Sequence, residues 1–337
     1  QIFIKETFGK IKNKIISKIP KNKKIRIGYY SADFYNHAMS YLLVRLFELH
    51  DKSKFEIIAF SFGPDKNDEL SKRISNTFNK FIKVNLKTDK EIAEISKKLN
   101  IDIAVDLMCY TTNSRIGIFS ERCAPIQINY LGYPGTSSAE FIDYVIADKT
   151  LIPKKNQKYF SEKIVYLPNT YQVRDSTQKI SNKTYKRKDF NLPEDNFVFC
   201  CFNQNYKITP DVYDIWMRLL KKVDGSVLWL LKNSDIGINN LKKEARKRGV
   251  DPNKIIFAER MAMPEHLARH KLADLFIDTF PYTAHTTCSD ALWAGLPVIT
   301  RIGESFASRV GASLLYAIGL EELITKTKTE YENLAIK

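Results

Sequence analysis

Histidine and cysteine are scarce in this chain of 337 residues, with five of each, and neither occurs in a metal-binding or disulfide pattern. The cysteines include no CxxC pair, and their odd number argues against a disulfide framework. His266 and His270 have the i,i+4 spacing that can bind a metal ion on a helix, but HExxH is absent and no further ligand cluster supports a site. We therefore expect reduced thiols, a cytoplasmic protein and no bound metal.

Long apolar runs and the common phosphate-binding loops are also missing. No run reaches the roughly 20 apolar residues that cross a membrane, so we expect no membrane contact. No Walker loop or GxGxxG fingerprint occurs, so nucleotide binding would have to rest on other features. The formal net charge of +15 attracts phosphates, acidic proteins or nucleic acid. Because the lysines are spread along the chain without an RNP, KH or zinc-finger pattern, solvated lysine-rich faces are favoured over nucleic-acid binding.

Two series of alternating strand and helix patterns run along the sequence. The first has expected strands at 25–29, 55–60, 101–107 and 126–131, and helices at 38–50 and 89–99. The second has expected strands at 197–202, 227–231, 255–258, 275–278 and 298–300, and helices at 211–222, 239–248, 265–271, 286–293 and 305–315. This alternation predicts parallel sheets with helices on both faces. The expected fold is α/β, with two Rossmann-like lobes facing a cleft.

Composition gives the expected domain boundaries. Residues 1–24 alternate apolar and lysine positions, which is typical of a basic amphipathic helical lead-in such as the end of a repeat region. The N-terminal lobe is assigned to 25–175 and the C-terminal lobe to 176–337. Residues 149–193, rich in Lys, Asn, Ser and Thr, are interpreted as a connector between the lobes. Ligands of open α/β sheets bind beyond the carboxyl ends of the strands, so residues just after strands are the candidates.

The strongest local signal follows the strand expected at 275–278. A loop leads to a helix start at which Thr286 or Thr287 is suited to be the N-cap. Backbone N–H groups and the helix dipole at such a position favour an anion, for example a diphosphate. Asp290, one turn further on, could accept hydrogen bonds from ribose hydroxyls. The alternative interpretation is a plain capped helix without a ligand.

Polar residues follow three other expected strands. Gln204 and Lys207 lie at a strand-to-helix turn, where a lysine could neutralise phosphate charge; a solvated loop lysine is the alternative. His37 follows the first strand and is a chemically plausible proton acceptor near neutral pH. Asp106 ends another strand and is the rival base. Its alternative is a structural carboxylate that accepts bonds from backbone N–H groups.

The most specific motifs are Leu-Gly-Tyr-Pro-Gly-Thr at 131–136 and His-Thr-Thr at 285–287 with Asp290. Through these and other stretches, over about residues 24–335, the chain resembles the catalytic region of O-linked N-acetylglucosamine transferases and SPINDLY-like proteins, particularly bacterial members. The resemblance implies a glycosyltransferase B fold, inversion at the anomeric carbon and no metal ion. Such proteins usually carry tetratricopeptide repeats before the catalytic lobes, and animal members have a long insertion between the lobes that is absent here.

The resemblance also implies roles for individual residues, mostly in a C-terminal lobe that binds the nucleotide sugar. His285, Thr286 and Thr287 would meet the diphosphate, Asp290 the ribose, Gln204 and Lys207 the leaving-group phosphates, His266 the nucleobase with Arg269 and Ala262 nearby, and Tyr133, Pro134 and Gly135 the sugar. One departure is Met263, which takes the place of a lysine found just before the nucleobase helix in animal members.

The implied activity is transfer of N-acetylglucosamine from UDP-N-acetylglucosamine to Ser or Thr hydroxyls of a protein or peptide acceptor. The nucleotide sugar is a substrate, and no cofactor is expected. A protein O-fucosyltransferase that uses GDP-fucose is the alternative within the fold. A catalytically silent binding or scaffold protein is the alternative from another class, and the set His37, Asp106, Gln204, Lys207, His285 and Asp290 argues against it. The patterns indicate no oligomeric state.

Overall fold

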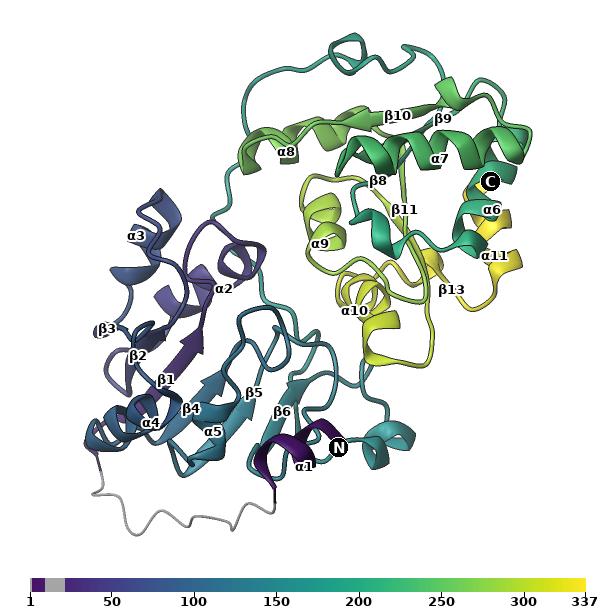
Figure 1. Ribbon diagram of the computed structural model, residues 1–337. Helices are drawn as coiled ribbons and strands as arrows, with labels where there is room; N and C mark the ends of the chain where they lie inside the picture. The colour runs from purple at the N-terminus through teal and green to yellow at the C-terminus, as the bar shows by residue number, and fades with distance from the viewer. Residues whose placement is uncertain (1, 10–21) are drawn as a thin grey trace. The chain divides into compact units, whose positions relative to one another are not determined.

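The computed structural model describes residues 2–9 and 22–337, and it divides into two compact units, Gln1–Thr177 and Gln178–Lys337 (Figure 1). Helix α1 (Ile2–Phe8) begins unit 1. Residues 10–21, which make up half of the expected basic lead-in, lie outside the described residues. No helix in the described ranges combines the length and the apolar character that a membrane crossing requires.

A single parallel sheet organises the described part of unit 1, with strand order β3-β2-β1-β4-β5-β6-β7. The strands are β1 (Ile25–Ser31), β2 (Phe55–Ser61), β3 (Lys80–Lys83), β4 (Ile103–Asp106), β5 (Ile126–Asn129), β6 (Tyr144–Ala147) and β7 (Lys163–Tyr166). The helices after α1 are α2 (Ala38–Glu48), α3 (Glu69–Ser75), α4 (Asp89–Lys98) and α5 (Gly117–Ser120), with a 3-10 turn η1 (Lys154–Tyr159).

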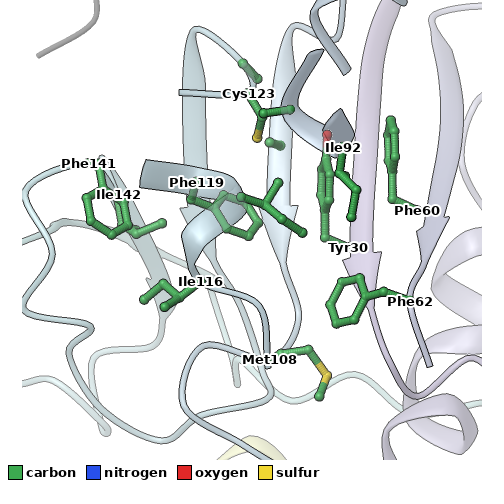
Figure 2. Packing of buried hydrophobic residues seen from close by; sticks show 14 of the residues in the cluster. Tyr30, Phe60, Phe62, Ile92, Met108, Ile116, Phe119, Cys123, Phe141 and Ile142 are labelled. Atoms are coloured by element: carbon green, nitrogen blue, oxygen red, sulfur yellow. The ribbon is translucent and has the colours of Figure 1, made fainter. Parts of the chain in front are cut away.

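Neighbouring tyrosines of β1 face opposite sides of this sheet, because side chains alternate along a strand. The Tyr30 ring stacks on Phe60 with centroids 4.4 Å apart, and Phe119 of α5 meets it edge-on at 5.2 Å (Figure 2). Tyr29 packs instead against Phe47 of α2, at 4.9 Å. The central strand is therefore covered on both faces, as parallel sheets require.

Unit 2 contains a second parallel sheet, with strand order β10-β9-β8-β11-β12-β13 among the described residues. The strands are β8 (Val198–Cys201), β9 (Val227–Leu231), β10 (Ile255–Ala258), β11 (Leu275–Ile277), β12 (Val298–Arg301) and β13 (Ile324–Thr325). The helices are α6 (Pro210–Lys222), α7 (Asp235–Lys247), α8 (Met263–Arg269), α9 (Thr286–Trp293), α10 (Val310–Ala317) and α11 (Lys328–Ile336). Short 3-10 turns are η2 (Arg187–Phe190), η3 (Asn205–Lys207), η4 (Pro252–Lys254), η5 (His270–Leu272), η6 (Phe306–Ser308) and η7 (Glu321–Leu323).

The predicted α/β class with parallel sheets is confirmed, but the interpretation of residues 149–193 as a connector is wrong. The 163–166 segment is strand β7, which pairs with β6 in the first sheet. Its side chains are alternately exposed and half-buried, as expected of a strand at the edge of a sheet. A short, lysine-flanked edge strand lacks the apolar run by which the buried strands were identified.

Candidate active site

The buried carboxylate of Asp278, directly after β11, connects three neighbouring strand ends of unit 2. Its Oδ1 accepts hydrogen bonds from the backbone N–H groups of Thr279 at 2.7 Å and Ala284 at 2.6 Å. Its Oδ2 accepts one from Thr300 Oγ1 at 2.7 Å, at the end of β12. Burial raises the pKa of Asp278 to about 6, although these bonds and the charge of Lys207 oppose the shift. This carboxylate fixes the loop that leads to α9.

Asn203, at the end of β8, ties that strand to the same loop and to α9. Its Nδ2 donates to Thr279 Oγ1 at 2.8 Å and, more weakly, to Asp278 Oδ1 at 3.3 Å. Its Oδ1 accepts a hydrogen bond from Thr287 Oγ1 in the first turn of α9. The ends of β8 and β11 and the start of α9 therefore form one hydrogen-bonded assembly.

Lys207 belongs to this assembly. Its Nζ donates to the carbonyl of Thr283 at 3.0 Å and lies 3.9 Å from the centroid of the Tyr282 ring. Burial lowers the pKa of Lys207 from 10.5 to about 8, while the carboxylate of Asp278 and the thiol of Cys201 oppose the shift. The ammonium thus lies beside the loop residues that immediately precede α9.

Helix α9 starts differently from the sequence-based expectation that Thr286 or Thr287 is its N-cap. His285 holds that position, and no side chain caps the first turn. Thr287 cannot cap because it is already helical and its hydroxyl bonds to Asn203. The His285 Nε2 donates to the carbonyl of Ala307 at 3.1 Å. The first amides of α9 therefore lack a side-chain cap, which is the situation in which a helix start favours an anion.

The imidazole of His285 is neutral. Burial and the neighbouring charge of Lys207 lower its pKa to about 3. Because a carbonyl only accepts, Nε2 carries the proton and Nδ1 is an acceptor in this tautomer. The side chain of His285 thus orients the loop, whereas the backbone N–H groups and the ammonium of Lys207 are donors that a phosphate could meet here.

Around the predicted nucleobase residues, the side chain of His266 is held by Arg269. The Arg269 Nη2 lies 2.6 Å from His266 Nδ1, and its Nη1 donates to the Glu259 carbonyl. Because guanidinium can only donate, Nδ1 accepts and the proton of the neutral ring lies on Nε2. Burial, reinforced by His270, lowers the pKa of His266 to about 2. The arginine therefore fixes both the orientation and the tautomer of this ring.

The other predicted donor residues of unit 2 lie on the same elements. The Phe202 ring at the end of β8 is 5.3 Å from the His266 ring, which joins the expected nucleobase group to β8. Ala262 precedes α8, and its carbonyl accepts the His266 N–H at 2.8 Å. Gln204 is exposed immediately before η3, and Asp290 is buried within α9.

In unit 1, the carboxylate of Asp106 accepts hydrogen bonds from the backbone of the residues that follow it. Its Oδ1 accepts the N–H groups of Met108 at 2.9 Å and Cys109 at 3.1 Å, and the residue is only 3% exposed. Burial raises its pKa to about 6, although the two N–H bonds lower it. This bonding matches the structural alternative for Asp106.

His37 lies at the N-terminus of α2 and is 40% exposed at its side chain. Its Nδ1 accepts the N–H of Met39 at 3.3 Å and lies 3.5 Å from Asp33 Oδ2. The two contacts favour opposite tautomers, because one needs a bare Nδ1 and the other a protonated one. A proton on Nδ1, directed toward Asp33, leaves Nε2 free to act as a base.

The loop that carries Tyr133, Pro134 and Gly135 is fixed by a buried glutamate. Glu162 accepts hydrogen bonds from Thr136 Oγ1 and from the N–H of Ser137, both at 2.6 Å. Tyr110 donates its hydroxyl proton to the Ser137 carbonyl, and its ring meets that of Tyr133 edge-on at 5.3 Å.

Close backbone contact places this loop against the end of β4. A Cβ on Gly132 would lie 2.0 Å from the carbonyl oxygen of Leu107, so only glycine fits. The expected sugar-pocket residues and Asp106 therefore lie at neighbouring strand ends.

Comparison with known proteins gives the family. A model described as glycosyl transferase family 41 matches residues 2–186 and 184–337. The chain belongs to glycosyltransferase family 41. This membership confirms the resemblance on which the donor-site expectations rest.

Individual proteins with similar sequences or structures support this family assignment. An Arabidopsis thaliana protein named probable UDP-N-acetylglucosamine–peptide N-acetylglucosaminyltransferase SEC is 39% identical, over 93% of this chain and 33% of its own length. The similarly named SPINDLY protein of Hordeum vulgare is 30% identical, over 94% and 34%. A mutant O-GlcNAc transferase of Thermobaculum terrenum superposes with a TM-score of 0.86 at 29% identity, over 93% of this chain and 59% of that chain. The chain thus spans about a third of the length of the curated relatives it matches.

Several residues that position the candidate residues within each unit had no role in the sequence-based expectations. Asp33 lies four positions before His37, and Asn203 adjoins Gln204. The expectation that ligands bind just after strands could therefore have selected both residues. Glu162 had no such signal, because its hydrogen-bond partners lie about 25 residues away in the sequence. The set without an expected role is Asp33, Asn203, Glu162, Asp278 and Tyr282. Among residues 2–9 and 22–337, no three His, Cys, Asp or Glu side chains are grouped as a metal site would require.

Replacing Asp278 by alanine should destabilise unit 2 by more than about 3 kcal/mol, because three buried donors lose an acceptor at about 1–3 kcal/mol each. Burial raises the pKa of the folded carboxyl from 3.8 to about 6, so its contribution to stability is complete below pH 4 and declines as the pH rises through 6. Urea unfolding followed by tryptophan fluorescence reports on unit 2, which holds all three tryptophans. The stability gap between wild type and variant should be larger at pH 4 than at pH 7.

The matched control is Thr300→Val, which removes a single donor to Asp278 and should cost about 1 kcal/mol. A gap that widens as the pH rises, or an Asp278→Ala variant as stable as Thr300→Val, would contradict this role.

Proposed function

We propose that this chain transfers N-acetylglucosamine from UDP-N-acetylglucosamine to Ser or Thr hydroxyls of a protein acceptor, with inversion at the anomeric carbon. The observation that carries the proposal is that, within unit 2, the Lys207 ammonium is held by the loop that immediately precedes the uncapped start of α9. The names of the relatives support this donor and a peptide acceptor. Five free, buried cysteines suit a cytoplasmic enzyme.

In the proposed reaction, the acceptor hydroxyl attacks the anomeric carbon from the face opposite the departing diphosphate. Negative charge then develops on the leaving phosphate. Lys207 and the first amides of α9 stabilise that charge, and one preorganised donor of this kind is worth roughly 3 kcal/mol. The network of Asp278 and Asn203 holds these donors in place before the donor sugar binds.

His37 is the proposed general base. Its side chain is partly exposed and its Nδ1 lies beside Asp33, whereas Asp106 is buried and already accepts two backbone N–H bonds. The carboxylate of Asp33 would hold the Nδ1 proton and leave Nε2 to receive the proton of the acceptor hydroxyl. Burial raises the pKa of Asp33, and the charge of His37 opposes that shift.

Donor choice is tested by thermal stability and by hydrolysis. UDP, but not GDP, should raise the melting temperature, because a ligand that binds only the folded state stabilises it by mass action. UDP-N-acetylglucosamine should also be hydrolysed slowly, and GDP-fucose should not. Stabilisation by GDP with turnover of GDP-fucose would replace the proposal by a protein O-fucosyltransferase. Binding of UDP without transfer to any peptide would favour a silent binding protein.

Replacing Lys207 by methionine should lower kcat about 100-fold, the equivalent of about 3 kcal/mol, with a smaller change in KM for the donor. Since burial lowers the pKa of Lys207 to about 8, wild-type kcat/KM should fall as the pH rises through 8 and the cation is lost. Lys207→Arg is the charge-conserving control, and its residual activity should stay level over that range. Unchanged kcat in Lys207→Met would contradict the assignment.

Replacing His37 by alanine should lower kcat about 100- to 10,000-fold and abolish the acidic limb of the pH–rate profile, because that limb reports protonation of the base. Asp106→Asn serves as the comparison, since it keeps the shape of the side chain. If Asp106→Asn loses the acidic limb while His37→Ala retains it, the base is Asp106.

A further inference from the structure

The aromatic ring of Tyr282 contacts two of the residues that the proposed function places at the diphosphate. Its centroid lies 3.9 Å from Lys207 Nζ and 5.0 Å from the centroid of the His285 ring. The same ammonium donates to the carbonyl of Thr283, the next residue in the chain. One ring and one carbonyl therefore hold the ammonium from the loop before α9.

Lys207 is partly buried and forms no ion pair among the described residues, and the charge of Asp278 acts on it from beyond ion-pair distance. Within the described part of the chain, no carboxylate lies within ion-pair distance of Lys207, whose contacts are the Thr283 carbonyl and the Tyr282 ring. The oxygens of Asp278 are directed to Thr279, Ala284 and Thr300 instead.

The other titratable groups near Lys207 are neutral. Burial raises the pKa of the Cys201 thiol and lowers that of His285 to about 3, so neither carries a charge near neutral pH. Lys207 itself is pushed by burial toward its uncharged form. The face of an aromatic ring carries negative potential and attracts a cation within about 6 Å, most strongly where water is excluded.

We infer that Tyr282 is a positioning residue: the face of its ring keeps the Lys207 ammonium charged and directed at the leaving diphosphate. The inference rests on the proposed function and extends it to a residue that does not itself touch the reacting atoms. In this arrangement the lysine contacts a ring instead of an ion-paired carboxylate. A carboxylate in that position would repel the incoming diphosphate, whereas a neutral ring does not.

The distinguishing comparison is between substitutions that keep the ring and those that keep only its bulk. Tyr282→Phe retains the aromatic face, so Lys207 should behave nearly as in wild type. Tyr282→Leu keeps much of the burial but loses the ring, so deprotonation of Lys207 becomes easier. A loss of cation–π attraction corresponds to about a 2- to 30-fold loss in UDP affinity at pH 8 and a basic limb shifted down by roughly 0.4–1.5 pH units.

The experiment measures UDP binding by calorimetry from pH 6.5 to 9.5 for wild type, Tyr282→Phe and Tyr282→Leu, with kcat/KM for UDP-N-acetylglucosamine in parallel. The same substitutions are then made in a Lys207→Met background. If Tyr282 acts through Lys207, Tyr282→Leu should have no further effect there, because the two effects are not independent. A purely structural role would lower affinity equally in both backgrounds without moving the pH limb.

A shape-conserving series keeps the test valid if Tyr282→Leu does not fold. Phenylalanine and trifluorophenylalanine at position 282 have nearly the same shape, but fluorination removes the negative potential of the ring face. UDP affinity should fall with fluorination in the Lys207 protein and stay constant in the Lys207→Met protein. Equal affinity across the series would overturn the inference.

Failure of the proposed function gives a different result. If wild type binds UDP with a basic limb that Lys207→Met lacks, while Tyr282→Leu leaves this limb unchanged, only the role of Tyr282 is overturned. If wild type does not bind UDP at all, the proposed function and the inference fall together.

Discussion

The carboxylate of Asp278 is the constraint on which the candidate site of unit 2 depends. This carboxylate is buried and comes directly after β11. It accepts hydrogen bonds from two loop amides and from Thr300, and a weaker one from Asn203. Those bonds determine the path of the chain from β11 to α9. They therefore determine the position of the Thr283 carbonyl, to which Lys207 donates, and the direction of the first backbone N–H groups of α9.

The site combines donors that are held in place with few opposing negative charges. Lys207 is partly buried without an ion pair among the described residues, and His285 is neutral. The start of α9 lacks a side-chain cap. The unpaired ammonium and the uncapped helix start are costly for an isolated fold, because desolvated charges and uncapped amides are normally compensated. A bound diphosphate would compensate both together, which is why we interpret them as parts of one anion site.

The fold was predictable from the sequence where strands are buried runs of apolar residues. Strand β9, with the sequence Val-Leu-Trp-Leu-Leu, is fully buried and was expected at its observed position. Strands β3, β6, β7 and β13 were not expected, because the first three are four-residue strands with half-exposed positions and β13 has only two residues. Because β7 was not expected, residues 149–193 were interpreted as a connector between the lobes.

The rule that ligands bind after strands selected Lys207, His285 and His37 as candidates, since it depends only on the order of elements. Contacts between residues that lie far apart in the sequence were not predictable in the same way. Tyr282 meets an ammonium that lies 75 positions earlier in the chain, and Glu162 reaches back to the loop at 136–137. The N-cap was misassigned because Thr287 bonds to Asn203, a tertiary contact that local sequence does not encode.

The most direct test of the central claim is a crystal structure of the protein with UDP. Our account predicts phosphate oxygens within hydrogen-bond distance of Lys207 Nζ and of the backbone N–H groups at the start of α9, with Asp278 still bonded to the loop. A diphosphate bound elsewhere in unit 2, with Lys207 still directed only at Thr283 and Tyr282, would contradict it.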